Sequence, residues 1–157
     1  MYATVQSIVE GVIIDGARYA LGRRPAGETV FGENRLHIIG GSVKPHSKSI
    51  SMLAEMAWMA KNEHGFEDIS YVAGPIATYT WQPGEHPIGW PRVELHVFRA
   101  VGAIPEGPDL VWYPYGKYPS QDEIMTGRAG EIHMELLREF HAWLENPQRP
   151  CTDLDQR

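Results

Sequence analysis

The chain has 157 residues, of which 43% are apolar and 22% charged, a size and composition typical of one soluble globular domain. Its formal net charge of −6 argues against a surface for nucleic acid or an anionic membrane, because both favour basic side chains. The single cysteine, Cys151, excludes an internal disulfide and, with no apolar run of about 18 residues and no signal pattern, predicts a cytoplasmic protein.

The N-terminal part predicts a β-hairpin. Asp15-Gly16 stands between two apolar runs, and this dipeptide favours the tight turn of a hairpin. We therefore expect strands at about 4–14 and 17–23. Residues 24–34 contain a proline and two glycines that break any hydrophobic period, so they predict a loop.

A strand, a glycine pair and a helix come next. Leu36, Ile38 and Ile39 are apolar, and residues 36–39 predict a short strand that ends at Gly40-Gly41. A helix is expected over about 50–64, with Gly65 in the position of its C-terminal cap. Its predicted buried stripe consists of Ile50, Leu53, Ala57 and Ala60.

The second half predicts more strands and a last helix. Strands are expected over 69–81, with a break at Gly74-Pro75, and over 92–103 and 110–113; the last helix is expected over about 129–145, with Ile132, Leu136, Phe140 and Trp143 or Leu144 buried. This order predicts an α/β fold in which helices cover both faces of a mixed sheet. We expect one domain over 1–146 and a loose C-terminal tail over 147–157.

The segment from the glycine pair to the helix end resembles a known family. It closes on Glu63-His64-Gly65-Phe66, and a glycine turn, a loop and a helix that ends in E-x-G-aromatic resemble the Nudix hydrolases. The segments GVIIDGARYALGRRP and VELHVFRAV look like the opening hairpin and the later core strand of that family. The resemblance implies a Nudix-like α/β/α sandwich, and a homodimer is expected by family analogy.

The box of the family, G-x(5)-E-x(7)-R-E-u-x-E-E-x-G-u, holds Mg²⁺ or Mn²⁺ through glutamates on one helical face, and in this chain it is degenerate. The last three glutamate positions correspond to Met59, Asn62 and Glu63, so one carboxylate remains. Glu94 and His96 share one face of a predicted strand and are candidates to complete a metal site with Glu63. The alternative is that this strand face is solvated or covered by a helix.

One branch of the family, the GDP-mannose mannosyl hydrolases, is similar in lacking part of the glutamate box. The basic segment Leu21–Gly27 resembles the segment that precedes the glycine turn in that branch, whereas Trp58 stands where the branch has an arginine. A histidine serves as the base in the branch. We therefore expect Glu63 and His86 to be catalytic, with His46 or a residue of the 104–109 loop as other candidates for the base.

Further side chains are candidates for binding a nucleotide-like substrate: Arg23, Arg24, Gly40, Gly41, Trp81 and Trp90. Arginines bind diphosphates in a bidentate manner, and tryptophans stack on bases or sugars. Ordinary surface charge and rim packing are the alternative interpretations. The spacing of Met52, Met56 and Met59 indicates core packing, and His133 and His141 are expected on a solvated helix face.

Two functions from different classes follow. The first is a divergent Nudix-type hydrolase that acts, with Mg²⁺ or Mn²⁺, on a nucleoside diphosphate linked to another moiety such as a sugar. The second is a catalytically inactive Nudix-fold protein that needs no cofactor and binds a nucleotide-like ligand or a protein partner. A fold supports both, because function depends on the site rather than on the fold.

Overall fold

The computed structural model describes residues 7–28, 30–42, 51–82, 85 and 91–156. The helices and strands, in chain order, are β1 (Ser7–Asp15), β2 (Arg18–Arg23), β3 (Leu36–His37), β4 (Ile39–Ser42), α1 (Met52–His64), β5 (Asp68–Thr80), β6 (Arg92–Val101), β7 (Leu110–Pro114), α2 (Gly127–Glu145), β8 (Thr152–Asp153) and the short 3₁₀ helix η1 (Leu154–Gln156). No helix in this part of the chain is long and apolar enough to cross a membrane.

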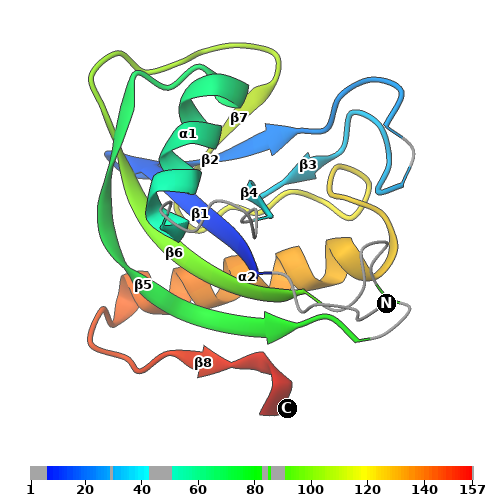
Figure 1. Ribbon diagram of the computed structural model, residues 1–157, viewed down its shortest axis with the longest axis vertical. Coiled ribbons are helices and arrows are strands. Elements are labelled where there is room, and N and C mark those ends of the chain that lie inside the picture. Colours follow the sequence, from blue (N-terminus) through cyan, green and yellow to red (C-terminus); the bar gives the residue numbers. More distant parts are fainter. Residues whose placement is uncertain (1–6, 29, 43–50, 83–84, 86–90, 157) are drawn as a thin grey trace.

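The strands form one mixed sheet with β1 near its centre. Strand β1 runs antiparallel to β2 and β4 and parallel to β6, while β5 is antiparallel to β6. Strand β7 runs antiparallel to β2 and pairs with its residues 18–22, and β8 runs parallel to β5 at the far edge. Figure 1 shows α1 and α2 on opposite sides of this sheet. The predicted α/β/α sandwich with a mixed sheet is therefore confirmed.

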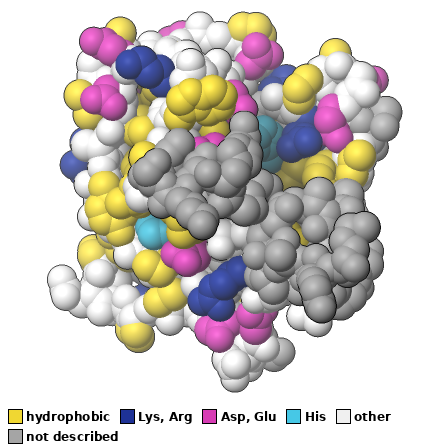
Figure 2. Space-filling model, in the orientation of Figure 1, with side chains coloured by type: hydrophobic (Ala, Val, Ile, Leu, Met, Phe, Trp, Pro, Cys, Tyr) yellow, Lys and Arg dark blue, Asp and Glu magenta, His cyan; other side chains and the backbone are white. Residues whose placement is uncertain are grey.

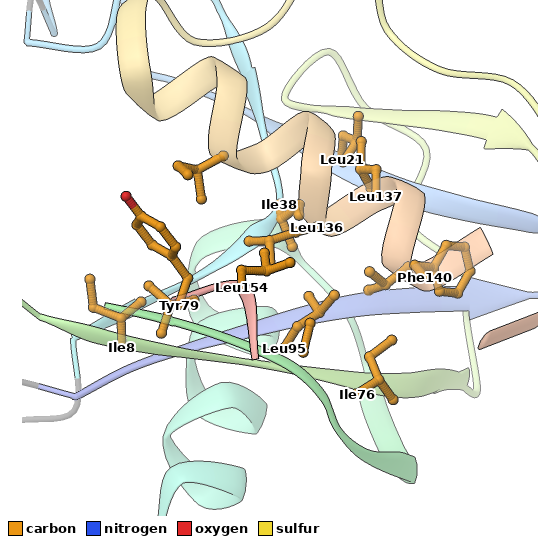
Figure 3. Packing of buried hydrophobic residues seen from close by; sticks show 14 of the residues in the cluster. Ile8, Leu21, Ile38, Ile76, Tyr79, Leu95, Leu136, Leu137, Phe140 and Leu154 are labelled. Carbon is orange, nitrogen blue, oxygen red and sulfur yellow. The ribbon is translucent and has the colours of Figure 1, made fainter. Parts of the chain in front are cut away.

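Two hydrophobic cores, one on each face of the sheet, follow from the alternation of side chains along the strands. In β1, Val9 and Ile13 point toward α1, whereas Ile8 and Val12 point toward α2. The core on the α2 side is the larger one, and Figure 3 shows residues of α2 such as Leu136 and Phe140 packed against the sheet. The two cores fix both helices relative to the strands that carry the site.

Helix α2 buries the stripe that its sequence predicts. Ile132, Leu136 and Phe140 are fully buried, and Trp143 and Leu144 pack at the edge of the same core. The expectation of a solvated face for His133 is wrong, because this side chain is only 4% exposed and its Nε2 lies 3.2 Å from Oε1 of Glu10 of β1.

Helix α1 is rotated relative to the predicted stripe. Leu53 is 37% exposed, whereas Met56, Met59 and Ala60 are buried. The rotation follows from the close approach of Met56 to Gly11 of β1, where an added Cβ would lie 2.5 Å from the methionine methyl group. The methionines thus form core packing, as expected. The structure does not describe Ile50, the first residue of the predicted stripe.

The sheet continues through the glycine pair, which corrects the predicted end of a strand at Gly40-Gly41. Both glycines belong to β4 and pair with Glu10 and Val9 of β1. A Cβ at Gly40 would collide with the backbone of Val9, so glycine permits the two strands to approach at this point. Strand β5 likewise runs on past Gly74-Pro75, and shifts in its register with β6 accommodate the irregularity.

The C-terminal segment is packed, where the sequence predicts a loose tail. Thr152 and Asp153 pair with Ala77 and Thr78 of β5, and Leu154 is only 5% exposed in the core on the α2 side. Arg149 also forms a 2.8 Å ion pair with the buried Glu139 of α2. One buried leucine and this ion pair therefore hold the segment against the domain.

Candidate functional site

A cavity of about 470 Å³ opens where the end of α1 meets β2 and β3. Its wall comes from distant parts of the chain, and its lining residues are Arg23, Arg24, Pro25, His37, Gly40, Glu63, His64 and Asp109. On the face that Figure 2 shows, one histidine side chain lies beside a basic side chain, with an acidic side chain next to them. We call this space the arginine cavity.

The last turn of α1 supplies Glu63 and His64. The helix starts at Ser51, whose hydroxyl accepts a hydrogen bond from the backbone N–H of Ala54 at 3.1 Å. It ends because Gly65 adopts a left-handed conformation with φ of 78° and donates its backbone N–H to Ala60. The cap stops the helix with Glu63 exposed and His64 half-buried at the cavity wall.

Two arginines at the end of β2 line the arginine cavity. Arg23 donates from Nε to the Pro108 carbonyl at 3.1 Å and from Nη1 to the Asn34 carbonyl at 2.8 Å. Arg24 donates from Nε to Glu28 at 3.2 Å, and its guanidinium carbon lies 5.3 Å from the centre of the Phe31 ring. These contacts orient both side chains and leave other N–H donors for an anion.

Two neutral imidazoles lie side by side in the cavity wall. The rings of His37 and His64 are 6.0 Å apart between centroids. Nδ1 of His37 donates to the Ile38 carbonyl at 2.8 Å, so its Nε2 carries a free lone pair. Burial lowers the pKa of His37 to about 3. Burial also lowers the pKa of His64, against the opposing effect of the Asp109 carboxylate, so both rings are proton acceptors at neutral pH.

A second, narrower cavity of about 130 Å³ adjoins the first and shares Arg24, His37 and Gly40 with it. It lies between the sheet and the first turns of α2, and its wall includes Gly41, Trp81, Phe31 and Met125. Glu10 and His133, whose Oε1 and Nε2 atoms lie 3.2 Å apart, also line this space. We call it the Glu10 cavity.

The predicted substrate-binding residues fall into these two cavities as far as the structure describes them. Arg23 lines the arginine cavity, Gly41 and Trp81 line the Glu10 cavity, and Arg24 and Gly40 line both. Trp90 and the candidate bases His86 and His46 lie outside the described residues. Of the 104–109 loop, Asp109 reaches the arginine cavity.

The predicted metal ligands do not come together. Glu63 lines the arginine cavity, whereas Glu94 and His96 pair with each other at 3.2 Å on β6. Among the described residues, no group of three His, Cys, Asp or Glu side chains could hold a metal ion. Two carboxylates, Glu63 and Asp109, share the arginine cavity. This set fits Mg²⁺, which binds proteins through one or two carboxylates and takes its remaining ligands from water and substrate phosphates.

The sequence does not predict four side chains of the two cavities as candidate site residues: Glu10, His37, His64 and His133. Glu10 is a charged residue between apolar residues in the middle of a strand, and His64 occupies the variable position of E-x-G. Gly22 also gave a signal, because glycine inside a strand indicates a close approach. A Cβ at Gly22 would lie 2.7 Å from His64 and 3.1 Å from His37.

Comparison with known proteins identifies the fold. No protein-family model and no curated protein matches the chain. Among solved structures, a UDP-X diphosphatase is similar with a TM-score of 0.65 and 16% identity over 98% of this chain and 68% of that one. An ADP-ribose pyrophosphatase from Streptococcus suis is similar with a TM-score of 0.60 and 13% identity over 96% of this chain and 98% of that one. The Nudix domain of Shewanella oneidensis NrtR, complexed with ADP ribose, gives a TM-score of 0.57 and 14% identity over 91% and 90% of the two chains. Nearly the whole chain therefore has the fold of the Nudix hydrolases.

Proposed function

We propose that this protein is a divergent Nudix-type hydrolase that cleaves a nucleoside diphosphate linked to another moiety, such as a sugar. One observation carries the proposal: Arg23, Arg24 and Glu63 line a single cavity of about 470 Å³. Two guanidinium groups bind the oxygens of a diphosphate in a bidentate manner. A similar fold in a UDP-X diphosphatase and an ADP-ribose pyrophosphatase supports this class of substrate.

Each side chain of the arginine cavity has a role in this proposal. Arg23 and Arg24 bind the diphosphate and neutralise the charge that develops on it. Glu63 and Asp109 would hold Mg²⁺ or Mn²⁺, which would polarise a phosphoryl oxygen when bound. His64 is uncharged at neutral pH because burial lowers its pKa, so its imidazole accepts the proton of the attacking water.

The alternative is a Nudix-fold protein that binds a nucleotide-like ligand without cleaving it. A specific observation favours it: Met59, at a glutamate position of the box, is only 5% exposed in the core on the α1 side. Asn62, at another glutamate position, donates to the backbone carbonyl of Trp58 at 2.8 Å. The arginine cavity would then bind the diphosphate without promoting its hydrolysis.

A hydrolysis screen distinguishes the two functions. UDP-sugars, GDP-sugars, ADP-ribose and dinucleoside polyphosphates are incubated with the protein and Mg²⁺ or Mn²⁺, and products are separated by ion-exchange chromatography. For a hydrolase, Arg24→Ala lowers kcat/KM about tenfold or more, because a hydrogen bond to a charged group contributes roughly 1.5–3 kcal/mol. Glu63→Gln lowers kcat, whereas Arg138→Ala and Glu145→Gln, which change charges outside both cavities, leave turnover unchanged.

The results of this screen distinguish hydrolysis from binding without hydrolysis. If no substrate turns over, but nucleotides raise the melting temperature of the wild type and not of Arg24→Ala, the protein binds without hydrolysis. If nucleotides neither turn over nor stabilise the protein, both proposals are wrong.

A further inference from the structure

The Glu10 cavity contains a buried carboxylate that is only half satisfied. Glu10 is 7% exposed, yet it is a charged side chain in the middle of the central strand β1. Its Oε1 atom lies 3.2 Å from Nε2 of His133. Its Oε2 atom is buried and has no hydrogen-bond partner among the residues that the structure describes.

The hydrogen bonds of His133 determine which groups remain for a ligand. The backbone N–H of Ile38 donates to Nδ1 of His133 at 3.0 Å, so this nitrogen carries a lone pair. The ring proton is therefore on Nε2, and it is donated to Oε1 of Glu10. An imidazole in this state is neutral, so His133 orients the Glu10 carboxylate without cancelling its charge.

The other charged or titratable side chains that the structure describes in the cavity wall do not donate a hydrogen bond to Oε2 of Glu10 either. Arg24 is the one arginine or lysine among the described residues of the cavity wall, and its Nε donates to Glu28. His37 donates its Nδ1 proton to the Ile38 carbonyl, so its free nitrogen is an acceptor. A buried acceptor without a donor destabilises a protein, and a donor brought by a ligand removes this penalty.

The shape and walls of the cavity favour a flat heterocycle. Its volume of about 130 Å³ suits one ring system, and Trp81 and Phe31 supply aromatic surface. The Glu10 cavity lies beside the arginine cavity and shares Arg24, His37 and Gly40 with it, a position that suits a ligand with a diphosphate attached to that heterocycle.

We propose that the Glu10 cavity binds the base of the substrate and that Glu10, positioned by His133, selects a guanine-type base. This inference rests on the proposed binding of a nucleoside diphosphate in the arginine cavity. A carboxylate offers two acceptor oxygens, so it matches an edge with two adjacent N–H donors. Guanine presents such an edge through its N1–H and its 2-amino group.

Other common bases fit this carboxylate less well. Adenine and cytosine place a ring-nitrogen acceptor next to their amino group, and this lone pair would face a carboxylate oxygen. Uracil presents one N–H between two carbonyl acceptors. Sites built to hydrogen-bond a substrate group discriminate strongly against analogues that lack it, because a buried polar group is then left unpaired.

Binding of free nucleoside diphosphates tests the inference by calorimetry with GDP, IDP, ADP and UDP in the presence of Mg²⁺. Inosine differs from guanosine by the missing 2-amino group alone, so GDP and IDP form the sharpest comparison. We expect the wild type to bind GDP about tenfold or more tightly than IDP, ADP or UDP. Glu10→Gln should bring the affinity for GDP close to that for IDP, because an amide retains one acceptor oxygen.

Two control variants separate base selection from phosphate binding. Glu131→Gln removes an exposed carboxylate of α2 outside both cavities and should keep the preference for GDP. Arg24→Ala should weaken the binding of all four diphosphates.

Glu10→Gln should also have a melting temperature equal to or above that of the wild type, because the amide removes a buried charge.

Three results are decisive. A preference for GDP that Glu10→Gln abolishes supports the inference. Equal binding of the four diphosphates by the wild type, or a preference for GDP that persists in Glu10→Gln, overturns it and leaves the proposed function intact. Absence of binding by any nucleoside diphosphate overturns both.

Discussion

Met59 of α1 packs directly over Gly41 of β4: a Cβ added to Gly41 would lie 2.8 Å from the methionine sulfur. In the Nudix box that the sequence resembles, position 59 carries a glutamate. Here the position is buried on the α1 side of the sheet. The side chain at position 59 of this chain is therefore part of the core on the α1 side.

A carboxylate restored at this position should destabilise the protein. We expect Met59→Glu to lower the free energy of unfolding by about 3 kcal/mol, because it buries a charge without a partner. Trp58→Glu is the matched control, since Trp58 is 54% exposed and the change should cost within about 0.5 kcal/mol. Urea denaturation measures both. If Mg²⁺ restored the stability of Met59→Glu, position 59 would face a metal site rather than the core.

The pair of imidazoles in the arginine cavity depends on Gly22. In Gly22→Ala, the new Cβ would lie 2.7 Å from His64 and 3.1 Å from His37, so both rings must move. We expect a loss of about 1–3 kcal/mol in stability and a lower kcat for the hydrolysis proposed above. Gly107→Ala is the control, because a Cβ there meets no atom within 4 Å. A Gly22→Ala protein with wild-type stability and turnover would show that neither ring needs its present position.

The sequence predicted the parts of the fold that depend on local patterns. The Asp15-Gly16 turn, the Gly65 cap and the stripe of α2 are each specified by neighbouring residues, and all three are confirmed. The rotation of α1 was not predictable in this way, because it depends on the contact between Met56 and Gly11, which are 45 positions apart.

In the candidate site too, the residues that belong to local sequence patterns were predicted, and those that depend on contacts between distant segments were not. Arg23, Arg24 and Glu63 are predicted because they lie in or beside segments that resemble a family motif, and all three line the arginine cavity. The pair of Glu10 and His133 was missed, because only the pairing of β1 and the packing of α2 bring these residues together. A single charged residue within an apolar strand is a weak signal, since it does not show which side chain will face it.

The packed C-terminal segment gives a further prediction. Leu154 is 5% exposed in the core between α2 and the sheet, where Figure 3 shows it near Leu136. Leu154→Ala should therefore lower the free energy of unfolding by about 2–4 kcal/mol. Gln156→Ala, a change at an exposed position of η1, should have almost no effect. Equal stability of the two variants in urea would mean that the segment does not contribute to the core.

The low pKa of His37 makes stability depend on pH. Burial lowers this pKa from about 6.5 to about 3, so below pH 6.5 the unfolded chain binds a proton that the folded protein does not bind. The contribution of His37 to the free energy of unfolding is therefore fully present above pH 6.5 and is lost as the pH falls toward 3. One pKa unit corresponds to about 1.4 kcal/mol, so His37 alone should remove about 2 kcal/mol between pH 7 and pH 5.

His64 acts in the same direction, because burial lowers its pKa as well. Urea denaturation at pH 7 and pH 5 measures the combined effect in the wild type. In His37→Gln the loss over this interval should be smaller by about 2 kcal/mol, whatever the stability of the variant at pH 7, because the comparison is made within one protein. If the wild type and His37→Gln lost equal stability between the two pH values, His37 would bind a proton as readily in the folded protein as in the unfolded chain. The wall of the arginine cavity would then carry a positive imidazolium at mildly acidic pH, rather than the neutral acceptor that the structure gives it.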